Sequence, residues 1–199
     1  MENLAFEIRR KLIHLSSVAY ILIYYFFEKI FSQKAALLTL VFLLICLSFL
    51  EFLKVKYNQK IPFFHKIYRD NERYTFSGSI YLIIGVIIAF GVFEFNIAVT
   101  AILMMIFGDT ASALIGRIGS HKIKRLGISW EGILAEFLVD IAVGFIFLNN
   151  LPVILVMALT ATFIEVVLKP VDDNLAIPVV AGFAGQSLMI ILRIFHSAF

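Results

Sequence analysis

The sequence predicts an all-α, polytopic integral membrane protein with about seven transmembrane helices and a cytoplasmic N-terminus. Of its 199 residues, 61% are hydrophobic and 16% are charged, and the mean hydropathy is +0.97. A soluble domain has about half of its residues apolar and about a quarter charged. The chain also contains seven apolar segments, each close to the roughly 20 residues that a helix needs to cross the hydrocarbon core. We expect a single domain over residues 1–199, because no gap between these segments would hold a soluble domain.

The seven segments follow one another along the chain with mostly short connections. The first is preceded by Arg9, Arg10 and Lys11 and so resembles a signal peptide, but no clear small-residue cleavage site follows, and we expect a retained anchor. The longest gap, residues 54–76, mixes Lys and Arg with aromatic residues. It suits either a helix in the headgroup region or a solvated loop. The predicted spans are residues 12–31, 35–53, 77–93, 96–116, 131–148, 151–169 and 175–195.

Lys and Arg are distributed unequally between the two sides of this predicted bundle. If the N-terminus is inside, 14 of the 17 fall on the inner side, and the outer side keeps only Lys29, Lys34 and Arg193. Positive residues mark cytoplasmic connections, so the N-terminus is predicted to be cytoplasmic and the C-terminus outside. The acids, amides and glycines gather at the same cytoplasmic ends. This one-sided arrangement predicts an active site that faces the cytoplasm.

Composition and motifs exclude several classes of site. Cys46 is the only cysteine, which excludes an intramolecular disulfide and a thiolate cluster for zinc. The net charge is +3, without a basic surface suited to nucleic acid. The sequence contains neither a GxxxxGK[ST] phosphate loop nor the glycine loop of protein kinases. A phosphate site would have to be of another kind.

Asp109 is a carboxylate within a helix that is otherwise apolar. Such a group costs a few kcal/mol in the membrane and should face a partner inside the bundle. One interpretation is a structural ion pair with a neighbouring helix. The other is a ligand for Mg²⁺, which binds through one or two carboxylates plus substrate phosphates. The glycines and cations that follow, Gly116, Arg117, Gly119 and Lys122, favour the second interpretation, because they are the ingredients of a nucleoside triphosphate site.

Four motifs in order, RKLIH, GDTASALIGRIGSHK, SWEG and DNLAIP, resemble those of the polyprenol kinase family. This family includes dolichol kinase, phytol kinase and the CTP-dependent diacylglycerol kinases, and it is related to the phosphatidate cytidylyltransferases. The resemblance runs from Arg10 to Pro178, nearly the whole chain. It implies a membrane enzyme that phosphorylates a lipid alcohol, either a polyprenol, an isoprenoid alcohol or a diacylglycerol. It also implies CTP as phosphoryl donor and Mg²⁺ as cofactor.

The resemblance assigns residues motif by motif. The first two elements fall on Arg10, Lys11 and His14, and on Gly108, Asp109, Gly116, Arg117, Gly119 and Lys122. The later elements fall on Ser129, Glu131 and Gly132, and on Asp173, Asn174 and Pro178, with Glu165 as the acid that commonly precedes the last one. Ile128 departs from the family, which often has Lys there, and Lys124 or Arg125 could reach the same phosphate.

These assignments imply roles in a phosphoryl transfer. Asp109, with Asp173 or Glu131, would hold Mg²⁺, and one of Glu131, Asp173 and His14 would deprotonate the lipid hydroxyl. The nucleotide-binding set comprises Lys11, Gly108, Gly116, Arg117, Gly119, Lys122, Ser129 and Asn174.

Some of these residues also have ordinary structural explanations. Glu131 would suit the dipole at a helix start, and Asp173 and Asn174 are normal N-cap residues. His14 could simply form a hydrogen bond at the interface. Glu51, outside the motifs, is three residues before Lys54 and could pair with it.

Glu136 and Asp140 are four residues apart on one face of the fifth span. They either bind the hydroxyl end of the substrate or satisfy partners such as Thr160 or Thr162. Gly132 and Gly144 share their face and favour close helix packing.

Two other functions remain open from the sequence. A cytidylyltransferase would use the same metal and nucleotide to form a CDP-lipid from a lipid phosphate. An ion-coupled transporter would use Asp109, Glu136 and Asp140 as a cation path, although no inverted repeat supports it. The sequence leaves the oligomeric state and the choice of lipid alcohol undetermined.

Overall fold

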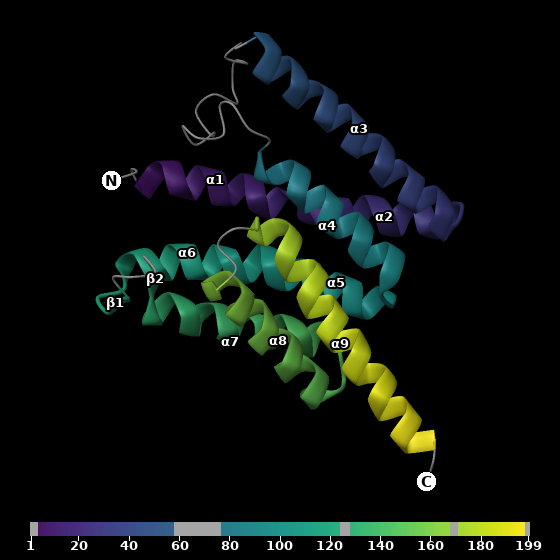
Figure 1. The fold of residues 1–199 in the computed structure, drawn as a ribbon, viewed down its shortest axis with the longest axis vertical. Coiled ribbons are helices and arrows are strands. Elements are labelled where there is room, and N and C mark those ends of the chain that lie inside the picture. The colour runs from purple at the N-terminus through teal and green to yellow at the C-terminus, as the bar shows by residue number, and fades with distance from the viewer. Residues whose placement is uncertain (1–3, 58–76, 124–127, 168–170, 198–199) are drawn as a thin grey trace.

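The computed structural model describes residues 4–57, 77–123, 128–167 and 171–197, and these residues are mainly helical (Figure 1). A π-helical segment, η3 (Met104–Gly108), joins α5 to α6, and a short antiparallel pair, β1 (Lys122–Ile123) and β2 (Ile128–Ser129), joins α6 to α7. The α-helices are α1 (Leu4–Ser16), α2 (Val18–Ile30), α3 (Gln33–Tyr57), α4 (Gly78–Val92), α5 (Phe95–Leu103), α6 (Asp109–Ile118), α7 (Trp130–Phe147), α8 (Leu151–Val167) and α9 (Asp173–Ser197).

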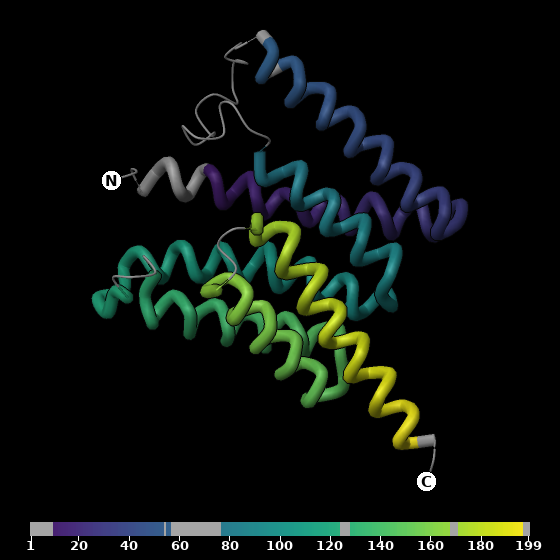
Figure 2. Tube along the Cα trace, viewed as in Figure 1, coloured from purple at the N-terminus to yellow at the C-terminus, as the bar shows by residue number. Residues whose placement is uncertain are grey.

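The predicted spans coincide with these helices. The first combines the end of α1 with α2, which continue in nearly the same direction (Figure 2), and the fourth combines α5, η3 and α6. Three helical stretches are long and apolar enough to cross a membrane: Gln33–Leu53, Phe95–Ile118 and Asp173–His196. Gly78–Val92 and Leu151–Val167 are apolar but shorter. The all-α class is therefore confirmed, with three candidate membrane spans, whereas the count of seven spans stays a prediction and most of the interfacial helix considered for 54–76 lies outside the described residues.

The stretch from Phe95 to Ile118 is the central helix of the bundle. In its most apolar window 72% of the residues are buried, compared with 17% for α3 and 33% for α9. Helices α4, α7 and α9 pack around it, while α3 extends along the periphery (Figure 1). Large side chains on α3, such as Phe42 and Phe49, are exposed, as expected for a helix that faces acyl chains. The polar side chains of Thr100, Thr110 and Ser112 on this helix are buried by protein.

Glycines bring α6 and α7 into close contact. A Cβ added to Gly132 would lie 2.9 Å from the Cα of Gly116, nearer than real side-chain carbons approach. On the same face of α7, a Cβ at Gly144 would meet Ile154 of α8 at 2.5 Å. The predicted close packing along this face of α7 is thus confirmed.

The π-helical segment η3 places Gly108 directly against α7. A Cβ at Gly108 would collide with the carboxylate of Asp140 and approach Glu136. Single π-helical turns inside α-helices often occur at functional sites. Here the turn leads into Asp109, the first residue of α6.

Candidate functional site

Asp109 is held by two side chains from α1. The Lys11 Nζ lies 2.5 Å from Asp109 Oδ1 and donates a hydrogen bond to the Asp109 carbonyl at 3.2 Å. The His14 Nε2 lies 3.4 Å from Asp109 Oδ2. Lys11 and His14 are three residues apart and so share one face of α1. Since Lys11 is only 2% exposed, Asp109 has the enclosed partner that a carboxylate in an apolar helix requires.

Asp173 joins this group from the start of α9. Its charge acts on Asp109, and the charge of Lys11 acts on it in turn. Its Oδ1 accepts a hydrogen bond from the backbone N–H of Asn174 at 2.9 Å. Asp172 Oδ1 accepts two more from Asn174, from its backbone N–H at 3.1 Å and from its Nδ2 at 2.8 Å. These bonds satisfy donors at the start of α9, as capping residues do.

Three further carboxyl groups come from α7 and α8, and we call them the inner carboxyl cluster: Glu136 and Asp140 of α7 and Glu165 of α8. Glu136 is 1% exposed and Asp140 is fully buried. Glu136 and Glu165 share a hydrogen bond, and Ser112 of α6 donates one to Glu165. Four oxygens of the cluster have no hydrogen-bond partner among the described residues: Glu136 Oε2, Asp140 Oδ1, Asp140 Oδ2 and Glu165 Oε2.

The structure excludes one explanation of Glu136 and Asp140. Thr160 donates its hydroxyl to the carbonyl of Val156, and Thr162 donates to Ala158, each on its own helix. These hydroxyl protons are therefore not available to the carboxylates. The suggestion that Thr160 or Thr162 satisfies them was wrong, because Ser and Thr in a helix readily bond the carbonyl one turn earlier.

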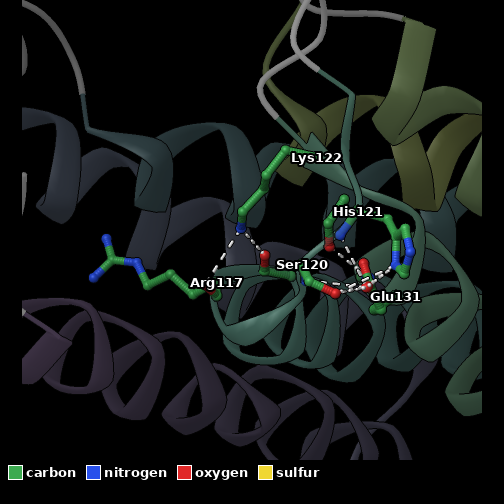
Figure 3. A network of polar contacts seen from close by, with 8 residues as sticks. Arg117, Ser120, His121, Lys122 and Glu131 are labelled. Atoms are coloured by element: carbon green, nitrogen blue, oxygen red, sulfur yellow. Dashed lines mark hydrogen bonds and ion pairs between the residues drawn. The ribbon is translucent and has the colours of Figure 1, made fainter.

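Glu131 belongs to a separate polar network at the corner between α6 and α7 (Figure 3). Its Oε1 accepts hydrogen bonds from the backbone N–H groups of Ser120 and His121 at 3.0 and 3.1 Å. The His121 Nδ1 lies 2.8 Å from the same oxygen. A Cβ at Gly119 would lie 2.6 Å from Glu131 Oε2 and 2.7 Å from the Ser129 hydroxyl. Glu131, Ser129 and Gly119 therefore hold the hairpin against the start of α7.

Lys122 is part of the same corner. Its Nζ donates to the carbonyls of Gly116 and Arg117, at the C-terminal end of α6 (Figure 3). A cation at this position satisfies carbonyls that the helix leaves unpaired and suits the helix dipole. The guanidinium of Arg117 points away from Glu131 (Figure 3). Lys124 and Arg125 lie outside the described residues.

The predicted site residues thus form two groups rather than one. Lys11, His14 and Asp109 meet at the start of α6, and the charges of Asp109 and Lys11 act on Asp173 at the start of α9. Glu131 lies near Gly119, ten residues further along, or roughly 15 Å at 1.5 Å per helical residue. The structure does not bring Glu131 to Asp109. It adds Ser112, which the sequence analysis missed although its spacing of three from Asp109 places both on one face of α6.

A magnesium ion would depend on few protein ligands here. Among the described residues, no group of three or more His, Cys, Asp or Glu side chains could hold a metal ion. Mg²⁺ at nucleotide sites needs only one or two carboxylates, because phosphates and water supply the remaining oxygens. Asp109 and Asp173, whose charges act on each other, fit that smaller requirement.

An apolar groove opens between α7 and α8. Its volume is about 820 Å³, and its walls include Trp130, Ile133, Phe137, Leu159 and Phe163. Trp130, Leu159 and Phe163 are largely exposed, so the groove lies on the outer face of the bundle. Its volume falls within the usual range of small-ligand pockets, roughly 300–1,000 Å³.

Glu51, near the end of α3, forms a hydrogen bond with Ser77, the residue that precedes α4. The Ser77 hydroxyl donates to Glu51 Oε1 at 2.9 Å, and both residues are buried. The side chain of Lys54 lies outside the described residues. Glu51 therefore connects α3 to the helix that follows the long gap.

These features define a helical membrane protein with an ion-paired carboxylate and a carboxyl cluster inside the bundle. The chain is homologous to CTP-dependent diacylglycerol kinase 1 of Saccharomyces cerevisiae, with 28% identity over 151 residues. This alignment covers 71% of the chain and 50% of the yeast protein. The protein of the same name from Eremothecium gossypii is 31% identical over 75 residues, which are 37% of the chain and 24% of that protein. Both similarities are to proteins named as CTP-dependent diacylglycerol kinases, which agrees with the resemblance of the four sequence motifs.

Another relative matches over a greater length. An uncharacterized protein of Rickettsia prowazekii is 27% identical over 193 residues, which are 89% of the chain and 92% of that protein. No family model matches the chain, and no solved structure matches it. The chain spans about half the length of the yeast kinase that it matches.

Proposed function

We propose that this protein transfers the γ-phosphoryl group of CTP to a lipid alcohol in the membrane. The observation that carries the proposal is the Lys11–Asp109 pair at the start of α6, because it falls in motifs shared with a family of lipid kinases. The homology to proteins named as CTP-dependent diacylglycerol kinases supports a lipid substrate and CTP as donor. The lipid is a polyprenol, an isoprenoid alcohol or a diacylglycerol.

We further propose that one domain, residues 1–199, crosses the membrane about seven times with its N-terminus in the cytoplasm. The charge distribution supports this topology, and so does the placement of the helix ends. The α2–α3 and α4–α5 turns and the end of α9 lie toward one side of the bundle, and the N-terminus and the hairpin lie toward the other (Figure 1). Glu94, in the α4–α5 turn, binds Arg193 near the end of α9, with 2.8 Å between Oε2 and Nη2. The active site would then open to the cytoplasm.

In this proposal Asp109 and Asp173 hold Mg²⁺, which neutralises charge on the phosphates when it is bound. Lys11 has three N–H donors, and its contacts with the carboxylate and carbonyl of Asp109 account for two. The third is suited to a phosphate oxygen. Arg117 and Lys122 lie further along α6 and would meet other parts of the nucleotide. His14 orients the Asp109 carboxylate.

The hydrocarbon chain of the substrate would occupy the groove between α7 and α8. The groove is apolar, and in the proposed topology it faces the bilayer, from which a lipid can enter sideways. Its polar exceptions, Thr160 and Thr162, donate their hydroxyls to their own helix and present little polarity to a ligand. Apolar walls of this kind suit a hydrocarbon tail, because the tail offers no polar groups for specific hydrogen bonds.

The decisive experiment supplies the purified protein with CTP labelled on the γ-phosphate and with geranylgeraniol, a polyprenol or dioleoylglycerol. The proposal expects label in a lipid phosphomonoester and release of CDP. Release of pyrophosphate from CTP and a lipid phosphate, with cytidine entering the lipid, would establish the cytidylyltransferase instead. Solute flux into liposomes without turnover of any nucleotide would establish a transporter.

A further inference from the structure

Lys11 occupies the side of Asp109 on which a cation would bind. Its Nζ is held by two oxygens of that residue, the carboxylate Oδ1 at 2.5 Å and the main-chain carbonyl at 3.2 Å. The other carboxylate oxygen, Oδ2, faces His14 Nε2 at 3.4 Å. Carboxylate and carbonyl oxygens are the ligands that suit Mg²⁺ and Mn²⁺. The oxygens of Asp109 therefore form a cation site, and the cation that they hold in the structure is the ammonium of Lys11.

A metal ion cannot share these oxygens with Lys11. Mg²⁺ binds oxygen at about 2.0–2.1 Å. An ion on Asp109 Oδ1 would thus lie within about 5 Å of the Lys11 ammonium, because the ammonium is itself 2.5 Å from the same oxygen. The Asp109 side chain is 13% exposed and that of Lys11 is 2% exposed, so solvent would screen the repulsion between the two cations only weakly. The ion pair and a metal ion on Asp109 are therefore competitors.

The Lys11 ammonium can leave Asp109 without a movement of α1. It is a compact charge at the end of a flexible four-carbon chain. Its contacts with Asp109 use two of its three N–H donors, and the third is suited to the first contact with a phosphate oxygen. A phosphate accepts charge-assisted hydrogen bonds as a carboxylate does, so the charge of Lys11 stays compensated when the ammonium moves.

We propose that Lys11 is an internal counter-ion that keeps divalent metal ions off Asp109 until a nucleotide binds. Lys11 then moves to the phosphates, and the Asp109 oxygens become free to hold the metal ion that accompanies the nucleotide. This inference rests on the proposed kinase function, because that function supplies the triphosphate. It predicts that the protein alone has a low affinity for divalent metal ions and that removal of the Lys11 charge raises this affinity.

The test measures Mn²⁺ binding to the purified full-length protein, without nucleotide or lipid, from the electron paramagnetic resonance signal of free Mn²⁺. Lys11→Met should bind Mn²⁺ at least about tenfold more tightly than the unmodified protein, because the competing charge is gone. Lys34→Met is the matched control, because it removes the same charge from an exposed position on α3 and should leave the affinity unchanged. Adding Asp109→Asn to Lys11→Met should abolish the gain.

Thermal stability gives a second measurement. In Lys11→Met the Asp109 carboxylate has lost its counter-ion, so Mn²⁺ should raise the melting temperature of this variant and leave that of the unmodified protein unchanged. Lys11→Gln also removes the charge but keeps an N–H donor for Asp109, and it should show the same two effects if Lys11→Met does not fold.

Equal Mn²⁺ affinities of the Lys11 variants and Lys34→Met would overturn the inference, and so would tight Mn²⁺ binding by the unmodified protein. Transfer from CTP by the unmodified protein, measured in parallel, tests the proposed function separately. Tight Mn²⁺ binding by the Lys11 variants, with no transfer by the unmodified protein, would reject the kinase function and support the competition between Lys11 and the metal ion.

Discussion

At the scale of single residues, Lys11 and Asp109 each offset the cost of enclosing the other. Both side chains lie inside the bundle, with Lys11 almost completely covered. Removing one partner of a buried pair leaves the other charge without compensation, typically at a cost of about 3–5 kcal/mol. The structural and catalytic interpretations of Asp109 are therefore compatible, and the pair can be both a packing element and part of the site.

A double-mutant cycle separates these two contributions. Asp109→Asn alone should lower the free energy of unfolding by several kcal/mol, because the ammonium of Lys11 is stranded. Lys11→Met in the same chain should recover much of that stability, because no uncompensated charge remains. Denaturant titration in detergent measures the stability, and transfer from CTP measures the activity.

Activity should not recover with stability if Asp109 serves the chemistry. The double variant is expected to be folded and nearly inactive. A folded double variant with substantial transfer activity would contradict the proposed role of Asp109.

The sequence could predict that Asp109 needed a partner, because burial of a lone carboxylate in an apolar helix is unfavourable. It could not predict that the partner was Lys11, because that contact joins residues 98 positions apart. It also could not separate Glu131 from Asp109. Both lie in family motifs, and only the length of α6 places Asp109 at one end of that helix and Glu131 of α7 beside its other end.

At the scale of elements, the corner between α6 and α7 depends on glycine. Gly116 and Gly132 let the two backbones approach, and Gly119 leaves room for Glu131 and Ser129. From the sequence, Gly116 and Gly119 are assigned to the nucleotide-binding set. In the structure the space beside them is occupied by α7 and by the side chains of Ser129 and Glu131, so these glycines already have a packing role.

Gly132→Ala tests this packing role. The added methyl group would lie 2.9 Å from two backbone atoms, Gly116 Cα and the carbonyl oxygen of Ser112. Overpacking of this kind typically costs about 1–3 kcal/mol of stability. Gly91→Ala is the matched control, because nothing lies within 4 Å of the added carbon. It should be neutral or stabilising by up to about 1 kcal/mol, since alanine favours helix.

Thermal melting of both variants in one detergent measures the difference. Equal melting temperatures for the two variants would contradict a close α6–α7 contact at Gly132.

The groove between α7 and α8 makes a prediction about chain length. Leu159→Trp would narrow the groove and should raise the KM for a long-chain alcohol several-fold more than for a short-chain one. Leu138→Trp is the control, because Leu138 is similarly exposed on α7 but does not line the groove. Kinetics with geranylgeraniol and a shorter prenyl alcohol measure the two KM values. The same increase for both alcohols in Leu159→Trp would place the chain elsewhere.

At the scale of the whole molecule, the sequence could predict the class of fold because the bilayer imposes length and hydropathy on every span. It could not show which helix is central. Residues 96–116 and 35–53 are both strongly apolar, yet the first is enclosed and the second faces outward. That difference depends on which helices pack together. Small residues on α5, such as the buried Ala98 and Ala101, are the feature of the sequence that indicates close packing of this helix.

The topology can be tested with cysteines placed at Ser120 and Asn149 in a Cys46-free variant. Cys46 must be removed because it is exposed and would react itself. Ser120 lies at the corner between α6 and α7, and Asn149 lies between α7 and α8, so the whole length of α7 separates them. With an odd number of spans and a cytoplasmic N-terminus, a membrane-impermeant thiol reagent added outside intact cells should label only Asn149→Cys. Ser120→Cys should react only after the membrane is opened.

Labelling of both positions from the same side would show that α7 does not cross the membrane. The two ends of α7, one next to Glu131 and the other next to α8, would then lie on the same side of the membrane. The seven-span topology would have to be abandoned, and with it the proposal that the active site faces the cytoplasm.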